Sequence, residues 1–126
     1  CDSYFPKTLT KHNDERGFFS EIIKTNSGGQ FSISTTLPGV TRGNHFHTRK
    51  IERFIVTQGN ALIELRRIDS NERLSFKLDS KNLNYIDMPI WYTHKIKNIG
   101  NTELITLFWI NEPYDPKNSD TYNLKV

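Results

Sequence analysis

The stretch from Gly39 to Gly59, GVTRGNHFHTRKIERFIVTQG, decides the fold class of this chain. It holds His45 and His47 two positions apart, and Glu52 follows after a short polar loop. Side chains two apart on a strand point to the same face, so the two histidines would aim into one cavity. Glu52, at the start of the next strand, could add an oxygen there. The stretch therefore favours a β-structure with a polar cluster in its interior.

Strand-forming residues dominate the rest of the chain as well. Thirteen Ile and twelve Thr stand against a single Ala, so β-branched residues greatly outnumber the strongest helix former. Short β-rich runs separated by turn signals predict about eight strands, at residues 18–24, 31–36, 52–57, 61–68, 73–78, 83–88, 94–99 and 104–110. An all-β jelly roll or barrel is the simplest architecture for such a series. The last stretch, residues 111–126, is rich in Pro, Asp and Asn and is predicted to lie across the surface.

Length, charge and cysteine content exclude several classes of protein. The 126 residues suit one domain, residues 1–126. The net charge of +3 is spread over interspersed basic and acidic residues, which argues against a nucleic-acid partner. The sequence also has no run of about 18 apolar residues, the length that a membrane-spanning helix needs. The only cysteine, Cys1, cannot form an internal disulfide, which favours a cytoplasmic protein. A first residue other than Met indicates a fragment, a processed form or an engineered chain.

A third histidine, His94, lies far along the chain in the segment PIWYTHKIKN, residues 89–98. Three imidazole nitrogens and one carboxylate would make a suitable ligand set for a divalent transition metal. The alternative is that the His45 and His47 pair lies on a solvated strand face. The fourth histidine, His12, lies in a polar stretch outside both segments and is predicted to be a surface residue.

The two histidine segments resemble the motifs of the cupin family. The first cupin motif has the order Gly, His-x-His, Glu, Gly, and its fixed positions are met by Gly39, His45, His47, Glu52 and Gly59. The second motif is matched by Pro89, His94 and Asn98, while Leu83 and Trp91 stand where glycine is usual. The resemblance implies a cupin double-stranded jelly-roll barrel. It also implies a metal held by His45, His47, Glu52 and His94.

A further motif, DERGFFSE at residues 14–21, could by itself be an exposed turn followed by an edge strand. Together with Arg42 and its neighbours, it resembles the dTDP-4-dehydrorhamnose 3,5-epimerase group of cupins. The resemblance implies that Arg16, Phe19 and Glu21 bind the nucleotide of the substrate and that Arg42 helps with the diphosphate. It also implies a homodimer in which the strand carrying these residues completes the neighbouring site.

Nearly the whole chain resembles the C-terminal cupin domain of capsular polysaccharide enzymes on the UDP-N-acetyl-L-fucosamine pathway. The resemblance covers residues 14–25, 30–59, 92–100 and 111–122. It implies a zinc-dependent epimerase that acts at C3 of a UDP-linked 4-keto-6-deoxy sugar before a separate NADPH-dependent reductase domain. The sequence has no Gly-rich dinucleotide fingerprint, so no nicotinamide cofactor is expected in this chain. A UDP- or dTDP-linked 4-keto sugar is the expected partner.

The two resemblances assign different roles to His45. It matches the base of the metal-free epimerases but a ligand of the metal cupins. Those epimerases carry Gln where this chain has His47 and Glu52, so we favour His45 as a ligand. Candidates for the proton-transferring group are then Tyr92 and Lys50, although Tyr92 could be a packed aromatic residue and Lys50 a solvated loop charge.

Three other functions remain open on the sequence alone. A nucleotide-sugar 3,4-ketoisomerase would use the same proton abstraction. A non-catalytic, metal-stabilised sugar-binding cupin would use the metal for folding only. A cupin dioxygenase would need iron, and it would leave the segment from Arg16 to Glu21 without a role.

Overall fold

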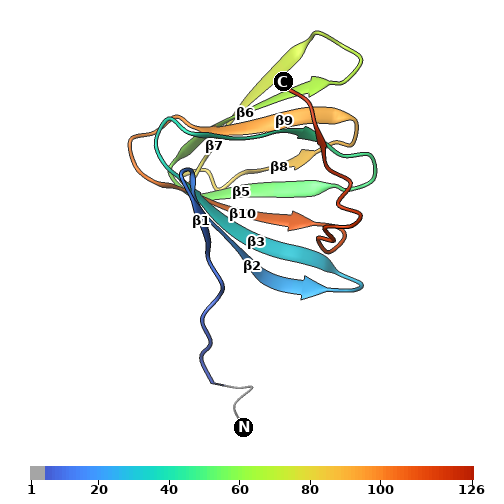
Figure 1. Cartoon of the computed structure of the whole chain (residues 1–126). Helices are drawn as coiled ribbons and strands as arrows, with labels where there is room; N and C mark the ends of the chain where they lie inside the picture. The colour runs from blue at the N-terminus through green and yellow to red at the C-terminus, as the bar shows by residue number, and fades with distance from the viewer. Residues whose placement is uncertain (1–4) are drawn as a thin grey trace.

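The computed structural model describes residues 5–126, which form antiparallel strands (Figure 1). The strands are β1 (His12–Asp14), β2 (Gly17–Thr25), β3 (Gly29–Thr36), β4 (Thr41–Phe46), β5 (Glu52–Gln58), β6 (Asn60–Arg67), β7 (Arg73–Asp79), β8 (Tyr85–Met88), β9 (Tyr92–Asn98), β10 (Leu104–Ile110) and β11 (Tyr122–Asn123). The described residues contain no candidate for a membrane-spanning helix. Cys1, on which the expectations about disulfides and location rest, lies outside the described residues.

The strands form two sheets that face each other (Figure 1). One sheet has the order β1-β2-β3-β10-β5-β8, and the other has the order β11-β4-β9-β6-β7. The chain crosses repeatedly between the sheets, for example from β4 to β5 and from β9 to β10, as it does in a jelly roll. The all-β, double-sheet prediction is therefore confirmed.

The predicted strand positions agree with β2, β3 and β5 to β10, with shifted ends. Strand β8 begins at Tyr85 because Leu83 lies in a turn with a φ of 48°. The eight predicted ranges omit β1, β4 and β11. Strand β4 was hard to recognise because it contains Gly43 and Asn44, whose φ angles of 111° and 62° are unusual for a strand.

The C-terminal stretch is more closely integrated than the sequence predicted. Strand β11 pairs with β4 and forms the edge of the second sheet. Asp120 and Val126 are only 4% and 3% exposed. The prediction of a surface segment is therefore wrong for Asp120 and Val126. Their burial depends on the pairing of β11 with β4, which lies far away in sequence.

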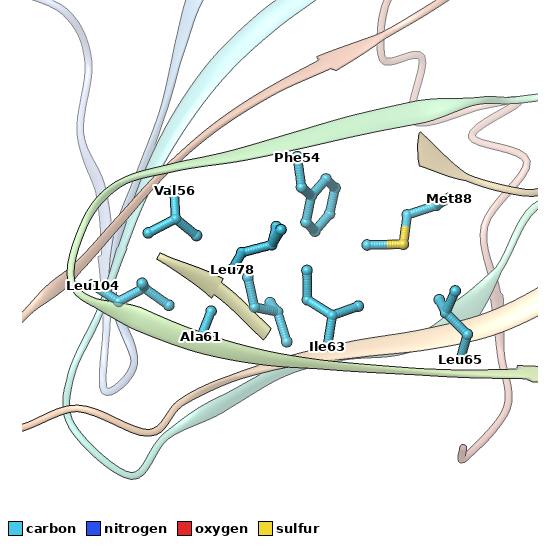
Figure 2. Close-up of a cluster of buried hydrophobic side chains, with 9 residues drawn as sticks. Phe54, Val56, Ala61, Ile63, Leu65, Leu78, Met88 and Leu104 are labelled. Carbon is cyan, nitrogen blue, oxygen red and sulfur yellow. The ribbon is translucent and has the colours of Figure 1, made fainter. Parts of the chain in front are cut away.

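A hydrophobic core fills part of the space between the sheets. Strands β5 and β6 alternate buried with more exposed residues, which directs Phe54 and Val56 toward Ala61 and Ile63 (Figure 2). Leu65, Leu78, Met88, Ile96 and Leu104 complete the buried cluster. Beyond Phe54 and Ile96, the interior continues into a cavity lined by polar residues.

Candidate metal centre and its cavity

Four side chains from different parts of the chain come together inside the barrel. They are His45 on β4, His47 directly after it, Glu52 at the start of β5 and His94 on β9. One possible ligand atom from each residue lies within 4.8 Å of the other three. The ring centroid of His45 lies 5.2 Å from that of His47 and 4.7 Å from that of His94. The structure thus brings together all four residues that the sequence singled out as metal ligands.

An irregularity in β4 directs its histidines into the barrel. The pairing of β4 with β9 shifts register between Gly43 and His45, and His45 then lies opposite His94. Such a bulge bends a strand and changes the direction of its side chains. A Cβ atom at Gly43 would lie 2.7 Å from the main-chain oxygen of His94, so only glycine fits this close approach.

Three ring nitrogens of the cluster are buried without hydrogen-bond partners among the described residues. Among the described residues, Nε2 of His47 and both ring nitrogens of His94 have none. His47 Nε2 lies 2.5 Å from Oε1 of Glu52. Unpaired buried nitrogens are costly and rare. Three imidazoles and a carboxylate arranged in this way fit a divalent transition metal such as zinc.

The electrostatics of the cluster favour a bound cation. Burial lowers the pKa of His45 and lowers that of His94 to about 4, so both imidazoles are neutral at physiological pH. Burial acts to raise the pKa of Glu52, but contact with His47 and the proximity of the other two histidines together lower it to about 2. For His47, the lowering effect of burial is outweighed by contact with Glu52, so its pKa is raised. The neutral imidazoles of His45 and His94 and the ionised carboxylate of Glu52 are in the protonation states that metal ligands require, whereas His47 must release its proton when a metal binds.

A cavity of about 420 Å³ lies above the cluster. One wall is aromatic: the ring centroid of Phe108 lies 5.5 Å from that of Phe19 and 5.4 Å from that of Phe54. Arg42 also lines the cavity, where Thr36 Oγ1 and the main-chain oxygens of Thr35 and Phe18 accept hydrogen bonds from its guanidinium group. The cavity therefore combines an apolar wall with a fixed positive charge.

Arg16, Phe19, Arg42 and Lys50 all line this cavity. Arg16 forms an ion pair with Asp14, which also lines the cavity, with 2.6 Å between Nη2 and Oδ2. Its hydrogen bonds to the Asp14 side chain lower the pKa of that carboxyl to about 2. Arg16 and Phe19 line the cavity of their own chain.

Lys50 lies in the loop between His47 and Glu52 and is 4% exposed. It is therefore not the solvated loop charge that the sequence also allowed. Burial lowers the pKa of its ammonium group. Nζ lies 5.8 Å from the centroid of the Tyr114 ring.

The structure does not bring Glu21 or Tyr92 to the cavity. Neither residue is among the described residues that line the cavity. Glu21 lies two residues beyond Phe19 on β2, next to a register shift in the pairing with β3. Tyr92 packs against the hydrophobic core and lines a separate hollow beside β7 and β8. The reading of Tyr92 as a packed aromatic residue is the one that its position favours.

Several residues of the cavity or of the cluster are not predicted from the sequence, and His12, Tyr114 and Asp120 are examples. His12 is exposed, as expected, but it lies opposite Phe19 in the β1–β2 hairpin and lines the cavity. Tyr114 lines the cavity next to Lys50. The main-chain oxygen of Asp120 lies 2.7 Å from Nδ1 of His47. The polar residues 12–14, which precede the predicted strand at residues 18–24, are a signal that could have identified His12. Tyr114 and Asp120 have no such local signal, because tertiary packing brings them to the cavity and the cluster.

Two of the proteins that this chain resembles are named for a UDP-linked sugar or for capsular polysaccharide assembly. The chain is 36% identical over 122 residues to the UDP-2-acetamido-2,6-beta-L-arabino-hexul-4-ose reductase of Pseudomonas aeruginosa, covering 97% of this chain and 33% of that protein. The crystal structure of the capsular polysaccharide assembling protein CapF of Staphylococcus aureus matches with a TM-score of 0.95 and 39% identity, over 100% of this chain and 34% of that one. The chain thus spans about a third of the length of these two relatives.

More distant structures agree on the fold. The cupin domain of Drosophila melanogaster CENP-C matches with a TM-score of 0.69 at 10% identity, over 81% of this chain and 74% of that one. This likeness identifies the two-sheet architecture as a cupin fold. Residues 12–122 match the family described as the polysaccharide biosynthesis C-terminal domain. The chain, a cupin related to capsular polysaccharide enzymes, therefore belongs to the family of polysaccharide biosynthesis C-terminal domains.

Proposed function

We propose that this chain is a nucleotide-sugar epimerase that inverts C3 of a UDP-linked 4-keto-6-deoxy N-acetyl hexose in surface polysaccharide synthesis. The main support is that one cavity contains both the four-residue ligand cluster and Arg42, the fixed cation expected for a diphosphate. A relative of the chain is named for a UDP-linked hexul-4-ose, which is a 4-keto sugar. On this proposal, the chain acts as the cupin part of a bifunctional epimerase and reductase or as a stand-alone relative.

The chemistry begins with the proton on C3, which is acidic because C4 carries a ketone. Its removal places negative charge on the C4 oxygen, and that charge must be stabilised. A zinc ion held by His45, His47, Glu52 and His94 would supply Lewis-acid polarisation of the ketone. The neutral imidazoles and ionised Glu52 are prepared to hold it.

Lys50 is our candidate for the group that exchanges the C3 proton. Its Nζ belongs to a buried side chain that lines the cavity, and burial favours the neutral amine that a base requires. The neutral amine takes the proton from C3 and becomes an ammonium group, which leaves an enolate on the sugar, and inversion is complete when a proton from solvent is delivered to the opposite face of C3. The C3 proton is thereby exchanged with solvent.

The other cavity residues bind and orient the sugar nucleotide. Arg42 offers a guanidinium group already held by three acceptors, which suits a diphosphate. Arg16 and Phe19 extend the site toward its exposed end, where the nucleotide would lie. The aromatic wall of Phe54 and Phe108 suits the methyl group of a 6-deoxy sugar.

A homodimer is part of the same proposal. Ile23, Phe31 and Trp109 form a cross-strand row on β2, β3 and β10, on the face opposite the cavity. Ile23 and Phe31 are exposed, and a second copy could cover them. Light scattering at micromolar concentration should give the mass of two chains, and Phe31→Glu should shift it toward one. A monomeric wild-type protein would overturn this part.

The test of the epimerase is exchange in heavy water. Incubation of the protein with the UDP-linked 4-keto sugar should place deuterium at C3 and invert that centre. A 3,4-ketoisomerase would also exchange the proton, but its product would carry the carbonyl at C3. No exchange above a protein-free control would refute catalysis, and a lower melting temperature after metal removal would then favour a metal-stabilised binding domain.

A further inference from the structure

The C-terminal segment, red in Figure 1, folds back along the second sheet, where β11 pairs with β4, the strand that carries His45. Tyr122 and Asn123 of β11 pair with Phe46 and His45 of β4. After β11, the main-chain N–H of Leu124 donates to the oxygen of Asn44 at 3.0 Å. The segment is therefore fixed directly beside the cluster, although it is more than 70 residues away in sequence.

Asp120, just before β11, directs its carboxylate into the loop between two of the ligands. Its oxygens accept hydrogen bonds from the main-chain N–H groups of Thr48, Arg49 and Lys50 at 3.0, 2.7 and 3.0 Å. The Thr48 hydroxyl donates a further bond at 2.6 Å. The Asp120 side chain has no exposed surface. One buried carboxylate thus fixes three successive residues between His47 and Glu52.

The main chain of Asp120 acts on His47 itself. Its carbonyl oxygen accepts a hydrogen bond from Nδ1 of His47 at 2.7 Å. Nδ1 therefore carries the proton in the neutral ring, and the lone pair of Nε2 points toward Glu52 and the centre of the cluster. Asp120 consequently sets both the tautomer of one ligand and the path of the loop that leads to the next.

We propose that Asp120 is the positioning residue of the metal centre, fixing His47 through its carbonyl and residues 48–50 through its carboxylate. The inference rests on the metal site of the proposed function but not on the identity of the sugar. Without the carboxylate, the loop loses four of its hydrogen bonds, and the ligand atoms lose part of their preorganisation. The centre should then bind metal more weakly and with a changed geometry.

The test is Asp120→Asn, which keeps the size of the side chain but directs an amide donor at the loop N–H groups. Asn tolerates the φ of 51° at this position, so the backbone is not strained. Competition with a chelator should show zinc affinity lowered about 10- to 100-fold, and the visible absorption of the cobalt-loaded protein should change. Asp115→Asn, an exposed residue of the same segment, should change neither.

Folded Asp120→Asn with wild-type zinc affinity and an unchanged cobalt spectrum would overturn the proposal. If this variant does not fold, Thr48→Val and Thr48→Ser decide instead. Val removes only the hydroxyl bond to Asp120 and should weaken zinc binding, whereas Ser retains the hydroxyl and should restore it. Equal affinities of these two variants would count against the proposal. None of these measurements uses a sugar, so a failure of the epimerase proposal would leave them unaffected.

Discussion

His45 and His94 are cross-strand partners on β4 and β9, and their ring centroids lie 4.7 Å apart. Neither ring nitrogen of His94 has a hydrogen-bond partner among the described residues, although the side chain is buried. Leaving buried polar atoms unpaired destabilises a protein. Without metal, the wild-type protein should therefore have a lower free energy of unfolding than a variant with an apolar side chain at position 94.

Replacing His94 with Leu should stabilise the metal-free protein but abolish its response to zinc. The variant removes unpaired buried nitrogens at similar volume, which we expect to raise the free energy of unfolding by about 1–3 kcal/mol. Urea unfolding with a chelator and with added zinc measures both effects. Two results would contradict this account of the site. One is a variant that is less stable than wild type without metal, and the other is a variant whose free energy of unfolding rises with zinc as much as that of wild type.

The metal-free protein should lose stability in acid because of His94. The pKa of His94 is about 4 in the fold and near 6.5 in the unfolded chain. Because the unfolded chain takes up this proton first, wild type should lose stability relative to His94→Leu as pH falls from 6.5 toward 4. The loss is about 1.4 kcal/mol for each pKa unit between the two states. Chemical unfolding across this window should show it, and a pH-independent difference would speak against the assignment.

Lys50→Met should stop proton exchange at C3 while leaving the metal in place. Met retains the apolar stem of Lys50 but cannot carry a proton, so exchange in heavy water should fall about 100-fold or more. Zinc content should remain that of wild type. Lys97→Met, on an exposed position of β9, is the matched control and should exchange normally. If Lys50→Met exchanges the C3 proton at the wild-type rate, another group must be the base.

Leu83→Gly should stabilise the protein. Leu83 has a φ of 48° and an exposed side chain, and a non-glycine residue in this region costs about 1–2 kcal/mol. Glycine removes that cost but gives the unfolded chain more freedom, so a net gain of about 0.5 kcal/mol is expected. Thermal unfolding should show a higher midpoint for Leu83→Gly than for Leu83→Ala, which keeps the Cβ atom. A higher unfolding midpoint for Leu83→Ala than for Leu83→Gly would show that the backbone at this turn is not strained.

Local patterns were sufficient for the parts of the structure that depend on short spacings. The alternation in β5 and β6 is visible in the sequence, and so is the spacing of His45, His47 and Glu52. Resemblance to the cupin motifs added His94, whose distance along the chain gives no local signal. Leu83 and Trp91 adopt positive φ angles of 48° and 66°, so the backbone at these positions has the conformation that suits the glycines of the motif.

Tertiary packing decided the rest. Nothing in the spacing of Tyr92 and His94 distinguishes a side chain in the core from one in the cavity, and the structure separates them. Asp120 lies in a segment whose composition is typical of a surface loop. Its burial arises because β11 pairs with β4 across most of the chain length, a relationship that no local pattern encodes.

Elemental analysis of the purified, dialysed protein is the most direct measurement of whether this interior is a metal centre. We expect about one zinc or other transition-metal ion per chain in wild type, and little in His94→Leu prepared in the same way. A wild-type protein without metal that also fails to take up added zinc, or equal metal content in the two proteins, would contradict the account.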